Sequence, residues 1–401
     1  MYAEQNQQHK ISTFYRMVKK MYHNAPPFFR SILTPVAKIT WLLRLLRVEQ
    51  WIISGEERYS GKKLELAYAG DEQNRCFFSK QAFGEKFSER YIGRTWLWKL
   101  AGRNGEPCSD SCLVINEVPR FLRSFFSGGQ SFYIPSWIDG EVDISPENAA
   151  LFKHRELSKH VMRKIQENDL SHSISDSPHD LRTFYHSMYQ PYISATYGKG
   201  AFLEEWDHIQ SVFKNCLLLF VKKGEEVIAG ILIRLLNNSR SHFWILGIKE
   251  GKSSHIEDGA IAALYYFGYN YLKERGYRKV DLGPSRAFLR DGVLEFKKRR
   301  GLQINGFSRM GLSVKPAAGS EAIKSFFMNN PFIYLEKDKL LGAIFIEGDH
   351  PPSQQEHQRF LINYGINGLS KLCFYSFSAS DGTLREIAPE DCINVTEEPG
   401  R

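Results

Sequence analysis

The stretch DLGPSRAFLRDGVLEFKKRRG, from Asp281 to Gly301, contains a carboxylate, a hydroxyl and several cations whose side chains could do chemistry. A carboxylate can take a proton from an amine or hydroxyl, and much of the rate of such a reaction comes from holding the reacting groups close together. Asp281 could be a base or an anchor for an amine, although a carboxylate that caps a loop at a strand end is equally common. Ser285 is the second candidate catalytic residue. Arg286 follows the same Gly-Pro turn and could hold a phosphate or carboxylate through two hydrogen bonds.

A group of basic side chains lies on the helix expected from about Gly292 to Arg300. Lys297 and Arg300 share a face at about 3.6 residues per turn, so both could bind the substrate. The alternative interpretation is a basic face that is only solvated.

Two tyrosines, Tyr189 and Tyr192, belong to an aromatic cluster on and after the helix that Ser177 caps and Pro178 opens. They could line a pocket for the acceptor. Packing in the protein core is the alternative.

A possible phosphate-binding segment precedes the long helix expected from about Glu257 to Arg275. Its four candidate cofactor-binding residues are Gly251, Lys252, Ser253 and Ser254. Backbone N–H groups at the start of a helix can hold a pyrophosphate such as that of coenzyme A. Glu257 and Asp258 would oppose an anion there, and a solvated turn is the alternative.

No metal site is expected. The cysteines are sparse in the sequence and are interpreted as structural or incidental thiols: Cys76, Cys108, Cys112, Cys216, Cys373 and Cys392. Cys108 and Cys112 have no second pair or histidine cluster to complete a zinc site. No Gly-x-Ser-x-Gly elbow supports a Ser-His-Asp triad.

The elements that would position these residues follow one another between about residues 155 and 315. We expect, in order, a strand, two helices, a meander of three strands, and then helix, strand, helix and strand: His160–Gln166, Ser177–Tyr189, Phe202–Phe213, Leu217–Lys222, Val227–Leu235, His242–Ile248, Glu257–Arg275, Lys279–Leu282, Gly292–Arg300 and Phe307–Val314. The runs LLLFV and VIAGILI are continuous, which is typical of strands that are buried on both faces.

This order resembles the Fem-type and related acyltransferases of the GNAT superfamily. The family pattern places an Asp-x-Gly at a strand end, then a Gly-x-x-x-Phe-Lys stretch and a final Gly, which here are Asp281 with Gly283, Gly292 to Lys297, and Gly301. The resemblance implies acyl-coenzyme A or aminoacyl-tRNA as the donor, and a substrate contact for Lys297. This chain departs from the family in having Arg300 before the final glycine and in lacking the usual Gly-rich phosphate loop.

The predicted fold class is α/β (α+β), with a GNAT-like mixed central sheet, helices on both of its faces and a second, degenerate α/β domain. We expect a basic amphipathic segment at residues 1–60, an α/β domain at 61–154, the acyltransferase domain at 155–315, an α/β region at 316–390 and an acidic tail at 391–401. Residues 28–48 are too charged to span a bilayer, but they could form a helix on an anionic membrane surface. Packing of that helix on the protein's own core is the alternative.

The sequence therefore predicts a cytoplasmic acyltransferase at the periphery of the membrane, whose acceptor is a small molecule or a lipid or envelope precursor. A degenerate GNAT-like binding or scaffold protein is the second hypothesis. Nucleic-acid binding is the third, and DNA is an improbable partner because no helix-turn-helix or RNA-binding signature accompanies the net charge of +8.

Overall fold

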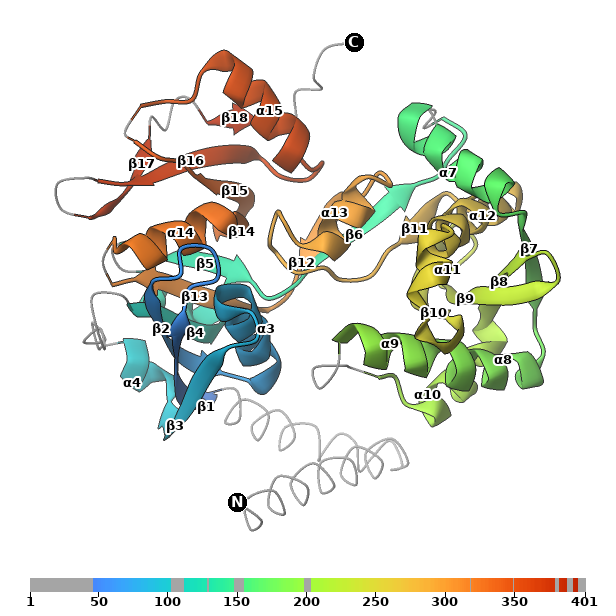
Figure 1. Ribbon diagram of the computed structural model, residues 1–401, viewed down its shortest axis with the longest axis horizontal. Coiled ribbons are helices and arrows are strands. Elements are labelled where there is room, and N and C mark those ends of the chain that lie inside the picture. Colours follow the sequence, from blue (N-terminus) through green and yellow to red (C-terminus); the bar gives the residue numbers. More distant parts are fainter. Residues whose placement is uncertain are drawn as a thin grey trace, which may run out of the picture.

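A computed structural model describes residues 46–101, 112–127, 130–147, 155–197, 203–317, 319–348, 350–378, 382–387 and 392–395. Their strands form three sheets. Figure 1 shows the first sheet and the second sheet as the two halves of the molecule, with the third sheet beside the first.

The first sheet has six strands, in the order β3-β1-β2-β4-β13-β5. Their bounds are β1 (Arg47–Glu56), β2 (Lys63–Gly70), β3 (Phe87–Trp96), β4 (Cys112–Pro119), β5 (Phe132–Pro135) and β13 (Met310–Pro316). The helical segments of this half are α3 (Glu72–Phe83), α4 (Leu97–Ala101), η1 (Arg120–Leu122) and α5 (Arg123–Phe126). Asp71 caps α3, because its side chain accepts a hydrogen bond from the N–H of Asn74.

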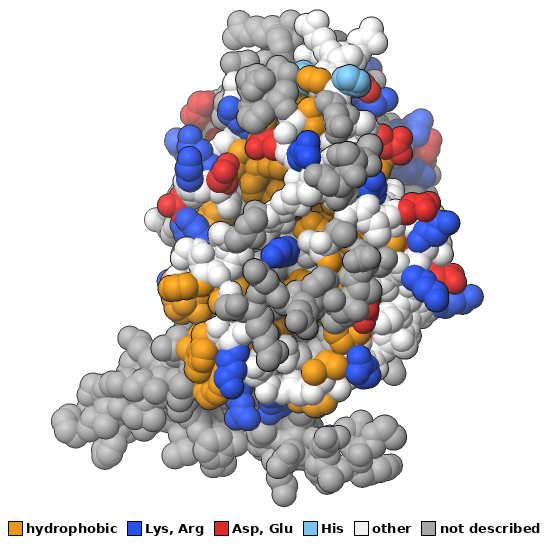
Figure 2. Space-filling model, turned by 90° about the vertical axis from the view of Figure 1, so that its left-hand side faces the viewer, with side chains coloured by type: hydrophobic (Ala, Val, Ile, Leu, Met, Phe, Trp, Pro, Cys, Tyr) orange, Lys and Arg blue, Asp and Glu red, His pale blue; other side chains and the backbone are white. Residues whose placement is uncertain are grey.

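The edge of the first sheet, strand β3 with the adjoining α4, leaves large apolar side chains exposed, among them Tyr91, Ile92 and Trp98. Figure 2 shows the side of the molecule on which this sheet lies, where hydrophobic side chains reach the surface next to Lys and Arg.

The second sheet has seven strands, in the order β12-β6-β11-β10-β9-β8-β7. Their bounds are β6 (Ile138–Asp143), β7 (Leu170–Ser175), β8 (Cys216–Lys223), β9 (Glu226–Leu235), β10 (Arg240–Ile248), β11 (Lys279–Asp281) and β12 (Gln303–Phe307). The helical segments around it are α7 (Arg155–Glu167), α8 (Pro178–Phe184), η2 (Tyr185–Tyr189), α9 (Gln190–Tyr197), α10 (Trp206–Val212), η4 (Phe213–Asn215), η5 (Lys249–Gly251), α11 (Ser253–Glu257), α12 (Ala260–Glu274) and α13 (Gly292–Lys298).

Helices cover both faces of this second sheet (Figure 1). On one face α12 packs closely, because Gly268 leaves room for the ring of Phe243 on β10. On the other face, α8, η2 and α10 bury a separate apolar cluster against β8, β9 and β10. A mixed central sheet with helices on both faces confirms the predicted fold class.

The two sheets pair their strands in the same pattern. In the second sheet β9, β10, β11, β6 and β12 pair antiparallel, parallel, antiparallel and antiparallel. In the first sheet β1, β2, β4, β13 and β5 repeat that series. The first half of the molecule is thus a second α/β domain with related topology, as the fold class predicted.

The chain crosses between the two sheets twice. β5 belongs to the first sheet and the following β6 to the second, whereas β12 belongs to the second and the following β13 to the first. The crossings are hydrogen-bonded to each other, since the N–H of Ser308 donates to the carbonyl of Trp137 at 2.9 Å. The domain boundaries at residues 155 and 315 stay predictions, but strand pairing crosses both of them.

Several of the predicted elements differ from the structure. Residues His160–Gln166 lie in helix α7 and not in a strand, because Val161 and Ile165 lie one helical turn apart and pack against the core. The strand expected at Phe307–Val314 is interrupted where the chain leaves the second sheet for the first. The long helix starts at Ala260, because Gly259 has a φ of +96° and separates α11 from α12.

The third sheet contains β14 (Phe332–Glu336), β15 (Lys339–Phe345), β16 (Lys371–Phe377), β17 (Leu384–Ile387) and β18 (Ile393–Asn394), with the helices α14 (Glu321–Asn329) and α15 (Gln354–Tyr364). β15 and β16 are parallel, and α15 makes the crossover between them. Most of the acidic tail lies outside the described residues.

Of the predicted interfacial segment 28–48, residues 28–45 lie outside the described part of the chain, and Arg47 and Val48 begin β1. Within the described residues, no helix has the length and apolarity that a membrane crossing requires.

Candidate functional site

Strands β10 and β11 separate at the centre of the second sheet. They pair in parallel at only three positions, which end with His242 opposite Asp281. β11 then ends, while β10 continues to Ile248 with a bulge between Phe243 and Ile245. Ligand sites in α/β proteins favour the carboxyl ends of parallel strands, and bulges are frequent beside active sites. We call this place the split.

Just before the split, Glu141 of β6 ties three strands together. Its carboxylate accepts a hydrogen bond from Arg240 of β10 at 2.8 Å and another from Lys279 of β11. Glu141 is 7% exposed, but the side chains of Arg240 and Lys279 are 43% and 47% exposed, so only the carboxylate end of these ion pairs is shielded from solvent. They fix β6, β10 and β11 where the separation begins.

The turn after β11 brings His242 and Asp281 to the same place. Oδ1 of Asp281 accepts a hydrogen bond from the N–H of Gly283 at 2.7 Å. Gly283 has a φ of +72°, which favours glycine. A Cβ atom at this position would lie 3.4 Å from Nε2 of His242, so the imidazole faces the turn.

His242 is suited to accept a proton. Burial lowers the pKa of its imidazole, and Arg234 and Lys297 lower it further, while the carboxylate of Asp281 raises it. Because the net shift is downward, the ring is neutral at physiological pH, which a general base requires.

Lys297 lies under the same turn. It is 5% exposed, and its ammonium donates hydrogen bonds to the carbonyls of Gly283 at 2.9 Å and Pro284 at 2.8 Å. Burial lowers the pKa of Lys297 to about 8, although Asp281, Asp291 and Asp139 raise it. Asp291 also positions this lysine, because its carboxylate caps α13 by accepting from the N–H of Leu294 at 2.9 Å.

Asp139 is a second carboxylate beside Asp281. It lies on β6, the strand that follows the first sheet in the chain. Loss of hydration raises the pKa of Asp139, the charge of Asp281 raises it further, and Lys297 lowers it. Asp139, His242, Asp281 and Lys297 thus form one electrostatic group drawn from four elements. An exposed carboxylate here could bind the cationic form of an amine.

The corresponding split of the first sheet is filled by its own side chains. There Glu117, at the end of β4, accepts a hydrogen bond from the N–H of Asp71, and the hydroxyl of Tyr68 donates to the carbonyl of Asp71. Gly70 leaves no room for a side chain, because a Cβ atom would overlap Tyr68 and Glu117. Burial raises the pKa of Glu117 to about 6. The second sheet is therefore the better candidate for a ligand site.

The structure turns Ser285 and Arg286 toward the junction of the two halves. Ser285 is buried and exchanges two backbone hydrogen bonds with Ile138, each 2.9 Å long. The guanidinium of Arg286 lies 3.9 Å from the ring centre of Trp137 and 4.7 Å from that of Phe77, and it donates to Oδ1 of Asn74. Their predicted roles stay predictions, since these contacts join structural elements.

Arg300 lies between α12 and α13. Its guanidinium stacks 3.3 Å from the ring centre of Phe296 and donates to the carbonyl of the same residue at 2.9 Å. Burial lowers the pKa of Arg300 to about 10. This side chain packs two helices together on the face opposite the imidazole of His242.

The tyrosines lie on the helices of the other face. Tyr189 is 3% exposed, and its hydroxyl accepts a hydrogen bond from the N–H of Glu204 at 3.1 Å. Tyr192 is half-buried and packs against the main core. The contacts of both residues support core packing, and their predicted part in an acceptor pocket stays a prediction.

The predicted phosphate segment lies at the far end of β10, in η5 and α11. The ammonium of Lys252 forms an ion pair with Glu250 at 2.7 Å. The first turn of α12 is covered by α7 and the turn after it. Lys164 of α7 lies against Gly259, and Asn168 of the turn donates to the carbonyl of Asp258. Phosphate binding by residues 251–254 stays a prediction.

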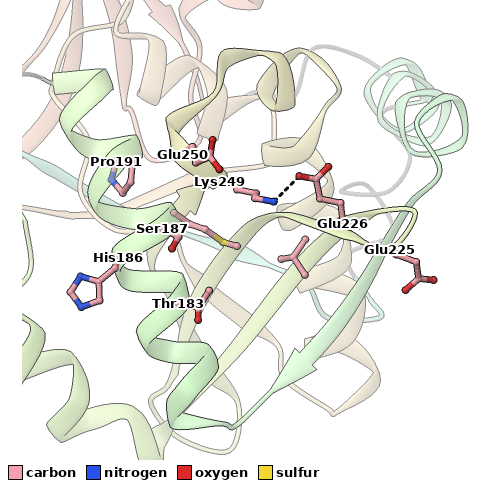
Figure 3. A pocket seen from close by; sticks show the side chains of 10 residues that line it. Thr183, His186, Ser187, Pro191, Glu225, Glu226, Lys249 and Glu250 are labelled. Atoms are coloured by element: carbon pink, nitrogen blue, oxygen red, sulfur yellow. Dashed lines mark hydrogen bonds and ion pairs between the residues drawn. The ribbon is translucent and has the colours of Figure 1, made fainter.

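A cavity of about 640 Å³ opens next to this segment (Figure 3). It is bordered by α8, η2 and α9 on one side and by the β8–β9 turn and η5 on the other. Figure 3 shows Glu226 and Glu250 near Lys249, which pairs with Glu226 at 2.7 Å, while Glu225 points away from it. Three carboxylates and one lysine line the cavity, and this negative charge disfavours the binding of a phosphate there.

No family model matches this chain, and no curated protein matches it. Among solved structures, L-PGS from Bacillus licheniformis is 14% identical, with 66% of this chain and 81% of that chain covered and a TM-score of 0.33. FemX is 11% identical, with coverages of 66% and 83% and a TM-score of 0.35. A GCN5-related N-acetyltransferase from Sphaerobacter thermophilus is 14% identical, with coverages of 66% and 76% and a TM-score of 0.31. These structures include the GNAT and Fem types that the sequence resembles.

Sequence reasoning missed His242 and Asp139. His242 begins the third strand of the expected meander, and its position opposite Asp281 appears only once the parallel register is known. Asp139 lies before residue 155, outside the predicted acyltransferase domain, and reaches the site because β6 crosses between the sheets.

Proposed function

We propose that this protein is an acyltransferase of the GNAT type whose reaction takes place at the split between β10 and β11. The observation that carries this proposal is the pairing of a neutral, half-buried histidine with a carboxylate where two parallel strands separate. The first sheet has the same topology but fills its split with hydrogen-bonded side chains.

In this proposal His242 is the general base. Its imidazole accepts a proton from the amine or hydroxyl of the acceptor, whose nitrogen or oxygen then attacks the acyl carbonyl. The new C–N or C–O bond replaces the C–S bond of a coenzyme A thioester, or the ester C–O bond of an aminoacyl-tRNA. The proton passes from His242 to the leaving thiolate or ribose oxygen, so no covalent enzyme intermediate is needed.

The carboxylates and Lys297 position the reactants. Asp281 and Asp139 would attract an acceptor that approaches as an ammonium ion and releases one proton to solvent before it reacts. Asp281 also raises the pKa of His242, which keeps its imidazole more basic. Lys297 holds the carbonyls of the turn after β11 and so fixes Gly283 against the imidazole.

A transfer assay with matched histidine variants tests the catalytic proposal. Release of free thiol from acyl-coenzyme A, and loss of labelled aminoacyl groups from tRNA, are measured with a panel of amine and hydroxyl acceptors. We expect His242→Ala to lower kcat by about 10²- to 10⁴-fold, the usual contribution of a general base, with little change in donor binding. His172→Ala is the control, since His172 is exposed on β7 of the same sheet. Equal turnover by both variants would refute the role of His242.

We propose further that the acceptor is a small molecule or a lipid or envelope precursor, and that the protein works in the cytoplasm at the surface of a membrane. The support is the basic excess of residues 1–60, with nine Lys or Arg against four Glu, and the exposed Tyr91, Ile92 and Trp98. Aromatic and basic side chains together favour the interface of anionic bilayers.

Sedimentation with anionic vesicles tests the membrane proposal. We expect binding to be lost when residues 1–45 are removed and weakened in Ile92→Asp/Trp98→Asp. Undiminished sedimentation of the shortened chain would contradict the part assigned to the N-terminal segment.

A binding or scaffold protein without catalysis is the second candidate. It is favoured by the carboxylates around the predicted phosphate segment, because Glu226 and Glu250 pair with the lysines that would otherwise attract a pyrophosphate. This candidate predicts no turnover of any donor by the wild-type chain, together with binding of the acceptor.

A further inference from the structure

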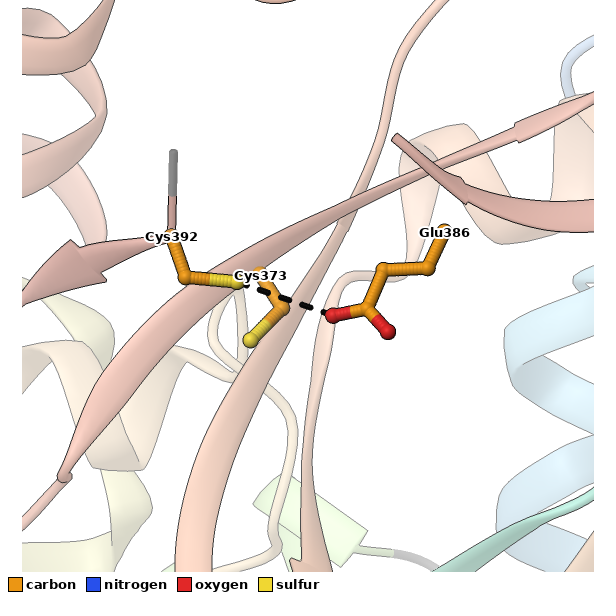
Figure 4. A group of neighbouring side chains, drawn as sticks. All are labelled: Cys373, Glu386 and Cys392. Carbon is orange, nitrogen blue, oxygen red and sulfur yellow. Dashed lines mark hydrogen bonds between the residues drawn. The ribbon is translucent and has the colours of Figure 1, made fainter. Parts of the chain in front are cut away.

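Two cysteines that are far apart in the sequence meet in the third sheet. Cys373 lies on β16, Cys392 directly precedes β18, and Glu386 lies on β17. Their ligand atoms, the two Sγ atoms and one carboxylate oxygen, all lie within 4.8 Å of one another. Figure 4 shows the three side chains converging from three separate segments, with Cys392 and Glu386 joined by the dashed line.

We propose that Cys373, Glu386 and Cys392 bind a Zn²⁺ ion. This inference is independent of the proposed acyltransferase activity. Cysteine thiolates and glutamate carboxylates are both zinc ligands, and the soft thiolates disfavour Mg²⁺ and Ca²⁺. Binding displaces the two thiol protons to solvent, so no oxidant or reductant is involved.

The geometry requires only a small contraction. Around a tetrahedral zinc ion, with metal–ligand distances of about 2.0–2.3 Å, neighbouring ligand atoms lie roughly 3.3–3.8 Å apart. Sγ of Cys392 already lies 3.6 Å from Oε1 of Glu386. Both cysteines are free thiols, so neither is consumed by a disulfide.

The candidate site is open to solvent on one side. Cys392 is 9% exposed and Glu386 is exposed. A water molecule can therefore complete the coordination from the side of Glu386.

The ion would stabilise the positions of β17 and β18, the last strands that the structure describes. β18 pairs with β16 at only two positions, and β17 is four residues long. A shared ligand set joins both segments to β16 by metal bonds in addition to these few hydrogen bonds.

Zinc titration of the full chain tests this site. The protein is reduced, freed of metal, and titrated with Zn²⁺ against a chromophoric chelator, with bound metal counted by mass spectrometry. We expect one equivalent for the wild type and for Cys216→Ser, whose thiol lies on β8 of the second sheet. Cys392→Ser should lose this equivalent, and Glu386→Gln should bind it at least about tenfold more weakly, since it keeps the shape but loses the charge.

A second measurement keeps the test decisive if the buried Cys373→Ser variant fails to fold. With Zn²⁺, the amides of β17 should exchange at least about tenfold more slowly in the wild type but not in Cys392→Ser. Unchanged stoichiometry in Cys392→Ser would overturn the proposal. So would a Cys373–Cys392 disulfide, seen as a loss of two hydrogens by mass, in protein that was purified in air without reductant, with dissolved oxygen as the oxidant, and that binds no zinc.

Discussion

At the scale of single residues, the site depends on opposing influences on His242. Burial favours the neutral imidazole, and the carboxylate of Asp281 favours the protonated form. Both act because the parallel register places the two residues opposite each other. The balance determines the pH at which the base becomes available.

The first prediction concerns this balance. Transfer should rise with pH as His242 loses its proton, and the midpoint of the rise should lie below the ordinary pKa of histidine, about 6.5. Asp281→Asn removes an influence that raises the pKa of His242, so the rising limb should move to lower pH. The measurement is kcat/KM against pH. Asp143→Asn, at the other end of β6, is the control, and a limb that stays in place in Asp281→Asn would contradict the coupling.

A second prediction concerns Lys297, whose pKa falls from 10.5 to about 8 on folding. Between these values the unfolded chain binds more protons than the folded one, so this lysine makes stability increase as pH rises. The shift corresponds to about 3 kcal/mol. We compare the free energies of unfolding of the wild type and of Lys297→Met. The difference, wild type minus variant, should increase by up to about 3 kcal/mol between roughly pH 7.5 and pH 10.5.

Urea unfolding at several pH values measures this difference. Lys63→Met changes an exposed lysine of β2 and should give a difference that hardly varies with pH. If Lys297→Met behaved in the same way, its ammonium could not be buried as the contacts with Gly283 and Pro284 require.

At the scale of elements, the π-helix η2 lies directly on β10. A Cβ atom on Gly247 would overlap the backbone of Met188 and Tyr189. Single π turns inside helices are frequent at functional sites. Here the turn sets the distance between the α8–α9 segment and the strand that carries His242.

The third prediction is that Gly247→Ala lowers the free energy of unfolding by about 1–3 kcal/mol or more, because the neighbouring backbone must shift to avoid the new methyl group. Gly292→Ala is the matched control, since a Cβ atom there would meet no atom within 4 Å. Its effect should stay within about 0.5 kcal/mol. Denaturant unfolding of the two variants gives the comparison, and similar values would show that η2 does not press on β10.

The elements also show what sequence could and could not predict. Continuous apolar runs gave the strands β8 and β9 correctly, since a strand buried on both faces needs them. The helix α7 is harder to predict, because a short segment with Val161 and Ile165 also suits a strand. A local motif indicates Asp281 and Lys297. No local motif indicates His242 and Asp139, because strand register and strand exchange are set by contacts distant in sequence.

At the scale of the whole molecule, the two halves share strands. β6 lies between β12 and β11, so the second sheet requires a strand from before residue 155, and the first sheet requires β13 from the end of the predicted domain. The exchanged strand β6 also carries Asp139 to the split and Glu141 to the ion pairs that precede it. Folding of the first half and assembly of the site are therefore coupled.

The fourth prediction follows from this exchange. A fragment of residues 155–315 lacks β6. Strand β12 then has no neighbouring strand, and Arg240 and Lys279 lose the carboxylate of Glu141. The fragment also carries β13 without β4 and β5, and an unpaired strand is prone to aggregate. We expect this fragment to be insoluble or to lack a cooperative unfolding transition by circular dichroism.

The control is the full chain cut at a protease site engineered between β6 and α7. Its pieces should stay associated, because β6 remains paired with β11 and β12. A fragment 155–315 that unfolds cooperatively would mean that the second sheet closes without its exchanged strand.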